Sequence, residues 1–172
     1  MSRPKKIIRN LIILAILLLL FLNRSGLYFS PLSAHEHSER SIHYGPSNVV
    51  HVENFDGGKY ILSKYDKWVS CNTVNRSLFF FWRLGDQPIG FENDKTKPLD
   101  FTWSRTYQNH KAYGIINDNR VKKIGITLSD GEVLTQTNFY DGLFLVTWTN
   151  NQEFKNIKGY DSNGQVIFES EH

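Results

Sequence analysis

An unbroken run of twelve apolar residues, from Leu11 to Leu22, constrains this chain more than any other feature. A helix that crosses a bilayer needs about 20 apolar residues, so the run by itself suits the core of a signal peptide. If Arg9 snorkels at one end and Tyr28 lies in the far interface, a helix from about Ile7 to Phe29 is long enough to span. We therefore predict that residues 1–29 form a signal anchor or a signal peptide.

Basic residues predict the orientation of this segment. Four precede the apolar run, Arg3, Lys5, Lys6 and Arg9, and two lie within the 20 residues that follow it, Arg24 and Arg40. The positive-inside rule then places the N-terminus in the cytoplasm and the rest of the chain outside, on a single-pass anchor in the cell membrane. The alternative is a secreted protein cleaved near Ala34. Leu32 is a poor residue two places before that site, so the sequence favours the uncleaved anchor.

Residues 30–43 are polar and show no periodicity, which predicts a linker. They contain His35 and His37, with His43 and His51 nearby, the one cluster of metal-capable side chains in the sequence. Two histidines two residues apart on an extended chain can face the same way, but a closed site needs further ligands. We expect a solvated linker here and predict no metal site.

Residues 44–172 are predicted to form one extracytoplasmic β domain. Aromatic residues make up 14% of the chain and fall in short runs separated by turns, as β proteins prefer. The segment Leu78–Leu84 is apolar on both faces, which predicts a central strand covered on both sides, with Trp82 in the core. The fold class expected is all-β, an antiparallel sandwich or small barrel after a single N-terminal hydrophobic helix.

The last third of the chain predicts a five-stranded antiparallel meander. Its strands are expected at residues 121–129, 132–140, 143–149, 154–160 and 165–169. Asp130-Gly131 and Asp141-Gly142 have the composition of two-residue type I′ hairpin turns. Ile124, Ile126 and Leu128 alternate and should share one buried face.

Several segments of this region resemble those of a known group of proteins. With the segments Tyr113–Asp118, Val121–Ile124, Leu128–Gly131, Phe144–Trp148 and Ile157–Glu169, the last 60 or so residues resemble small uncharacterised exported or membrane-anchored proteins of Gram-positive bacteria. The resemblance implies a bacterial origin, an extracytoplasmic location and a β-rich domain. It implies no functional residue.

One strand is a candidate binding surface. Residues 100–107 alternate strictly, so Phe101, Trp103, Arg105 and Tyr107 share one face. If exposed, this face is a flat platform for a sugar ring or a partner protein, and if buried it is the inner face of a sheet. Burial is the favoured alternative, and ligand binding through these four side chains is the competing hypothesis.

The sequence carries no strong motif for chemistry. It contains no Gly-x-Ser-x-Gly elbow, no His-Glu-x-x-His and no phosphate-binding glycine loop, so no catalytic residue and no cofactor are predicted. The net charge of +3 is concentrated before the apolar run, which argues against nucleic-acid binding. We expect a membrane-tethered accessory or protein-interaction module with an envelope protein as its partner. A module binding envelope glycan or a small ligand is the alternative, and an enzyme is less favoured.

Overall fold

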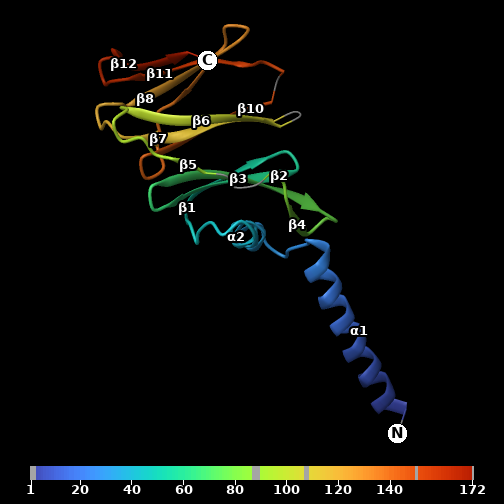
Figure 1. Ribbon diagram of the computed structural model, residues 1–172. Coiled ribbons are helices and arrows are strands. Elements are labelled where there is room, and N and C mark those ends of the chain that lie inside the picture. Colours follow the sequence, from blue (N-terminus) through green and yellow to red (C-terminus); the bar gives the residue numbers. More distant parts are fainter. Residues whose placement is uncertain (1–2, 87–89, 107–108, 150, 172) are drawn as a thin grey trace. The chain divides into compact units, whose positions relative to one another are not determined.

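Helix α1 (Arg3–Ser25) begins the computed structural model, which describes residues 3–86, 90–106, 109–149 and 151–171 (Figure 1). The helix ends where Gly26 takes a positive φ of 67°, the left-handed conformation that commonly terminates helices. The expected continuation to Phe29 is therefore wrong. No helix among the described residues is both long enough and apolar enough to qualify as a membrane-crossing segment.

The two residues after Gly26 belong to the folded part of the chain. Leu27 is only 6% exposed. The backbone of Tyr28 pairs with that of Trp82: Tyr28 N donates to Trp82 O (2.9 Å), and Trp82 N donates to Tyr28 O (2.8 Å). The backbone of Tyr28 is thus held against the strand that contains Trp82.

Helix α2 (Pro31–Ser41) occupies the stretch expected to be a linker. Ser30 caps it, because its side chain accepts a hydrogen bond from Ser33 N (3.0 Å), and Pro31 suits the first turn of a helix. One face is buried, through Ala34, His35, Ser38 and Glu39. The expectation that His35 is solvated is therefore wrong.

The rest of the chain is β structure in three antiparallel sheets, as the sequence predicted in its main feature. The first sheet has the order β1-β2-β3-β4, with β5 also paired to β3: β1 (Asn48–Phe55), β2 (Gly58–Tyr65), β3 (Trp68–Ser77), β4 (Phe81–Leu84) and β5 (Phe91–Glu92). The second has the order β10-β7-β6: β6 (Leu99–Thr106), β7 (Asn109–Ile116) and β10 (Leu143–Trp148). The third has the order β12-β11-β8-β9: β8 (Lys123–Leu128), β9 (Val133–Gln136), β11 (Phe154–Tyr160) and β12 (Val166–Glu171). The described strands form no closed barrel.

The chain divides into two compact units. Unit 1 comprises Met1–Pro46, Glu53–Tyr60 and Asn72–Pro88. Unit 2 comprises Ser47–Val52, Ile61–Cys71 and Ile89–His172. Unit 1 therefore contains both helices and β4, and unit 2 contains β6 to β12.

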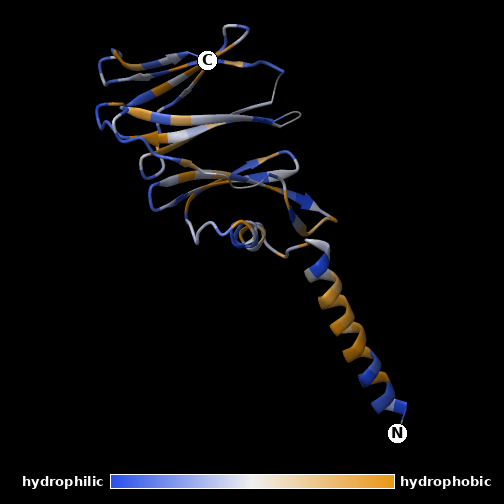
Figure 2. Cartoon of the chain, in the orientation of Figure 1, coloured by the Kyte–Doolittle hydropathy of each residue, from blue (hydrophilic) through white to orange (hydrophobic). Residues whose placement is uncertain are grey.

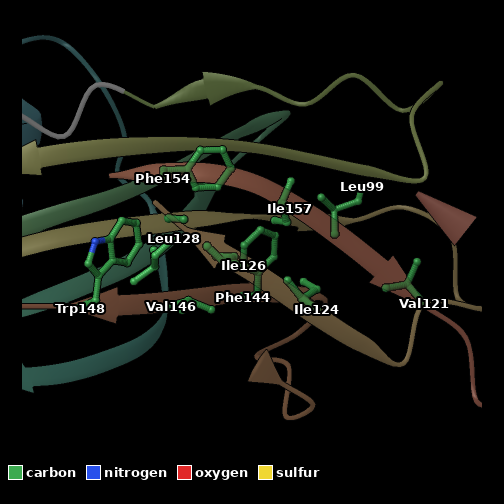
Figure 3. Packing of buried hydrophobic residues seen from close by; sticks show 11 residues of the cluster. Leu99, Val121, Ile124, Ile126, Leu128, Phe144, Val146, Trp148, Phe154 and Ile157 are labelled. Atoms are coloured by element: carbon green, nitrogen blue, oxygen red, sulfur yellow. The ribbon is translucent and has the colours of Figure 1, made fainter. Parts of the chain in front are cut away.

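The core of unit 2 draws side chains from the second and third sheets (Figure 3). Ile124, Ile126 and Leu128 alternate along β8 and are fully buried, which confirms the face predicted for them. From β10, Phe144 and Trp148 enter the same cluster. Burial of this many apolar side chains is the main stabilising contribution to unit 2.

The predicted five-stranded meander is wrong in one strand. Strand β10 leaves the third sheet and pairs with β7, in the register Val146↔Ala112. Its link to the preceding chain is a single bridge, Tyr140↔Leu143. The turn at Asp141-Gly142 has φ values of 47° and 75°, as a type I′ turn requires, but at Asp130-Gly131 only the glycine has a positive φ.

The expected central strand at Leu78–Leu84 is also wrong. Only Phe81–Leu84 is a strand, β4, and it lies at the end of the order β1-β2-β3-β4. The three residues before it form the turn of the β3–β4 hairpin, and Phe79 there is 92% exposed. Apolar composition alone thus misassigned this segment.

Gly114 of β7 allows a close approach that no other residue permits. A Cβ at this position would overlap Asp100 O and lie 2.6 Å from Phe144 Cε1. We expect Gly114→Ala to lower the free energy of unfolding of unit 2 by about 1–3 kcal/mol, because an overpacked core must shift. Chemical denaturation measures this. Gly159→Ala is the matched control, since its nearest atom lies 3.4 Å away, and equal losses in the two variants would contradict the packing argument.

Candidate functional site

The two rings of the predicted binding strand are half-buried in unit 2. Trp103 on β6 stacks on Phe154, with ring centroids 5.7 Å apart and planes 13° apart. Phe101 lies 5.7 Å from Phe154 and 6.5 Å from Phe168, in an edge-to-face arrangement with the latter. Both rings pack against the core cluster, so they do not form a flat exposed platform.

Of the two polar residues in the predicted strand, Arg105 and Tyr107, the structure describes only Arg105. Arg105 is exposed and its Nη1 lies 3.2 Å from Glu153 Oε1, an ion pair across the surface of unit 2. Tyr107 lies outside the described residues. Ligand binding by these four residues stays a prediction, and the packing of Phe101 and Trp103 weakens its motive.

A different aromatic side chain lies between two cations, in unit 1. Trp82 is half-buried on β4, opposite Arg76 of β3 in the register Arg76↔Trp82. Arg76 Cζ and Lys59 Nζ each lie 5.7 Å from the centroid of the Trp82 ring. Cations at this distance interact favourably with an indole face. The expected core position of Trp82 is thus replaced by a partly exposed one.

This trio lines a groove of about 390 Å³ in unit 1. The β1–β2 turn forms part of its wall, and Arg76 N donates a hydrogen bond to Gly57 O there (2.7 Å). Asp56 and Asn54 also line it, and Asn54 Oδ1 accepts a hydrogen bond from Lys59 Nζ (2.5 Å). Two cations, one carboxylate and a half-buried indole ring suit a ligand with an anionic head and an apolar part.

Next to the groove, four large apolar residues are exposed; we call this set, Phe29, Leu78, Phe79 and Phe80, the aromatic tip. Their exposed fractions are 66%, 61%, 92% and 63%. Phe81 joins them, because its ring lies 5.1 Å from that of Phe29 and 4.4 Å from that of Phe80. The apolar run that suggested a buried strand was the sequence signal for this surface.

Beneath α2, unit 1 contains a buried polar cluster. His35, 1% exposed, places Nε2 3.2 Å from Oε1 of Glu39, and its Nδ1 is 3.1 Å from Nδ2 of Asn72 on β3. Burial lowers the pKa of His35, although the carboxylates of Glu39 and Glu36 act to raise it. In a neutral imidazole with its proton on Nε2, Nδ1 can accept from the amide of Asn72, while Nε2 faces the carboxylate of Glu39. The cluster fixes α2 to β3.

His35 and His37 do not act together. His35 faces the interior, whereas His37 is exposed and its ring centroid lies 5.1 Å from that of Tyr28. Across the described ranges, no group of three His, Cys, Asp or Glu side chains is placed to bind a metal ion.

Unit 2 contains a second buried histidine, His110 on β7. Its ring stacks on Trp148 at 5.4 Å and 12°, and neither ring nitrogen has a hydrogen-bond partner in the described structure. Burial lowers the pKa of His110, Arg105 lowers it further, and Glu153 acts to raise it. The ring is therefore a neutral, flat component of the core.

Comparison with known proteins gives no assignment for these surfaces: no family model, no curated protein and no solved structure matches the chain.

Proposed function

We propose that the chain is a membrane-tethered β module, anchored by α1 with its N-terminus in the cytoplasm and its β structure outside. The observation that supports this is the exposure of apolar side chains all around α1. From Ile7 to Phe21 the large apolar residues are 48% to 64% exposed, and Figure 2 shows this apolar stretch between polar ends. A helix that is apolar on all sides is stable only in apolar surroundings.

The ends of α1 suit the two surfaces of a bilayer. The helix from Ile7 to Ser25 is about 28 Å long at 1.5 Å per residue, close to the hydrocarbon thickness of about 30 Å. Arg9 and Arg24 can extend their charged groups toward water from either end. Because residues 11–21 have no polar face, a position flat in the interface is disfavoured.

We infer that the anchor is not cleaved. Ala34, the candidate cleavage position, is fully buried in α2, and Leu27 before it is also part of the fold. Cleavage there would remove the first turn of α2 and its Ser30 cap. Secretion after cleavage near Ala34 is therefore the alternative with less support.

The role proposed for the module is that of an accessory or interaction domain in the cell envelope, possessing one cation-and-aromatic surface on unit 1. This agrees with the resemblance to small exported or membrane-anchored proteins of Gram-positive bacteria. We further infer that the second and third sheets pack face to face as a sandwich. Binding of an envelope glycan through Phe101 and Trp103 has less support, since these rings pack on Phe154.

The anchor is tested by placing charges in α1. We expect Leu14→Arg/Leu18→Arg to release the full chain from carbonate-washed membranes, because each arginine costs about 2.5–3.5 kcal/mol at the centre of a membrane helix. The control, Leu14→Met/Leu18→Met, should stay in the membrane with its β part open to external protease. A wild-type chain that fractionates with the cytosol would refute the tether, and a mature mass lacking residues 1–34 would show cleavage.

A further inference from the structure

We propose that the aromatic tip of unit 1 inserts into the interfacial layer of the membrane and that the cations around it bind anionic lipid headgroups. The β3–β4 hairpin would then be a second membrane contact beside α1, holding unit 1 down on the lipid. This inference rests on the proposed tether, and the experiment below separates the failure of one from the failure of the other.

The chain path brings the tip close to the point where α1 ends. The last residue of α1 is Ser25, and Tyr28, three residues later, is hydrogen-bonded through its backbone to Trp82 of β4. Three residues of extended chain cover at most about 10 Å. Paired strands lie about 5 Å apart, so whatever the direction of α1, Trp82 of β4 lies within about 15 Å of the place where the chain leaves the anchor.

The backbone of the hairpin holds its apolar side chains outward. Leu78 and Phe79 have φ values of 45° and 64°, the left-handed region that bulky residues rarely adopt. Phe80 N donates to Leu78 O (2.7 Å), which keeps the turn tight. Strain of this kind persists where the surrounding structure imposes it, and it is concentrated at functional sites. Phe79 is 92% exposed, so its ring adds little to the core, whereas insertion into the interfacial layer of a membrane would bury it.

The charges around the tip match an anionic surface. Unit 1 carries Arg24 at the end of α1, Lys59 on β2, Arg76 on β3 and Arg83 on β4, and in the described structure none of the four forms an ion pair. These four cations outnumber Asp56, the carboxylate that lines the groove with Lys59 and Arg76. Arg76 and Lys59 flank Trp82 beside the groove, where a phosphate could reach both cations while its acyl chains follow the apolar residues. Basic side chains near an anionic bilayer surface each strengthen its binding.

The same charges select lipid over a second copy of the chain. Two tips packed against each other would bury the phenylalanines but would also bring these unpaired cations together, and like charges at an interface oppose association. An anionic bilayer takes up the apolar side chains and neutralises the cations at the same time.

The test uses the full chain in nanodiscs of phosphatidylcholine, with or without phosphatidylglycerol. Phe79→Cys is labelled with the fluorophore NBD, and wild type reports any labelling at Cys71, which is buried. We expect dithionite, a reductant confined to water, to bleach the label several-fold more slowly with phosphatidylglycerol present. Adding Arg76→Glu and Arg83→Glu should reverse this protection, by about fivefold in the docked-to-free ratio for each charge removed. Arg76→Lys/Arg83→Lys keeps the charge and is the matched control.

Retention in the nanodisc is measured on the same samples. A chain that stays in the disc while its label bleaches at the same fast rate in both lipids overturns the docking and leaves the tether standing. A chain that leaves the disc overturns the tether. Equal protection in both lipids would overturn headgroup binding, and protection that rises with the number of chains per disc would identify a second copy as the occupant instead.

Discussion

Removing residues 1–34 should unfold unit 1, whereas removing residues 1–25 should leave it folded. The longer truncation deletes Leu27, whose burial contributes about 2 kcal/mol, and Tyr28, whose two hydrogen bonds to β4 contribute about 1 kcal/mol each. It also deletes the Ser30 cap of α2, which contributes about 1 kcal/mol. These losses approach the total stability of a small domain, about 5–15 kcal/mol.

Hydrogen exchange at the amides of α2 and β4 measures this directly. With residues 1–25 removed, these amides should be as protected as in the full chain, because the buried side chain of Leu27, the backbone pairing of Tyr28 and the Ser30 cap are all retained. With residues 1–34 removed, they should exchange freely. Equal protection in the two truncations would show that residues 26–34 are dispensable, and a cleaved, secreted form would then be as plausible as the tethered one.

The sequence predicted those features that depend on one strand or one turn alone. The alternation of Ile124, Ile126 and Leu128 identifies a buried face whichever sheet covers it. Asp141-Gly142 adopts the positive φ values that its composition favours. Both are local properties, so they do not depend on the rest of the chain.

The partner of β10 could not be predicted in this way. A two-residue turn favours pairing with the preceding strand, yet β10 pairs with β7, far from it in sequence. The pairing is favoured by packing: Gly114 on β7 leaves room for Phe144 to lie fully buried against it. A fit of this kind becomes visible only once the two strands are placed together.

The candidate site was missed because apolar composition was equated with burial. Leu78–Phe80 could have formed a strand in a core, and no periodicity distinguishes that outcome from an exposed turn. The cations that accompany it, Lys59 and Arg76, meet at Trp82 only through the pairing of β2, β3 and β4. Apolar residues on the surface of a protein are stabilised when they can insert into a membrane interface.

Helix α2 was missed for a related reason. Its inward face is made of Ala34, His35, Ser38 and Glu39, so it carries too little apolar character to produce a periodic signal. Only the cap, Ser30 followed by Pro31, indicated a helix start. The stability of this helix depends on the buried contacts of His35 with Glu39 and Asn72.

His35→Leu should lower the free energy of unfolding of unit 1 by about 1–3 kcal/mol, because the buried carboxylate of Glu39 loses its imidazole neighbour and Asn72 loses an acceptor. Replacing both members, in His35→Leu/Glu39→Met, should recover much of the loss, since apolar residues of similar volume need no polar partner. Chemical denaturation of the three proteins in the same detergent measures both effects. If the double variant is as unstable as the single one, the loss comes from the altered shape of the side chain and not from the lost contact between the imidazole and the carboxylate of Glu39.

The pH dependence of stability gives an independent readout of the same contact. The folded-state pKa of His35 is lowered, so below about pH 6.5 the unfolded chain binds a proton that the folded chain does not, and stability falls as the solution is acidified. The contribution of His35 is complete above that pH and is lost progressively below it. His110 acts in the same direction, because its pKa is lowered too. His35→Leu should therefore reduce the loss of stability between about pH 7 and pH 5 without abolishing it. An unchanged acid dependence would mean that the imidazole of His35 is not held neutral in the folded chain. The protonation assigned to the ring between Glu39 and Asn72 would then be wrong.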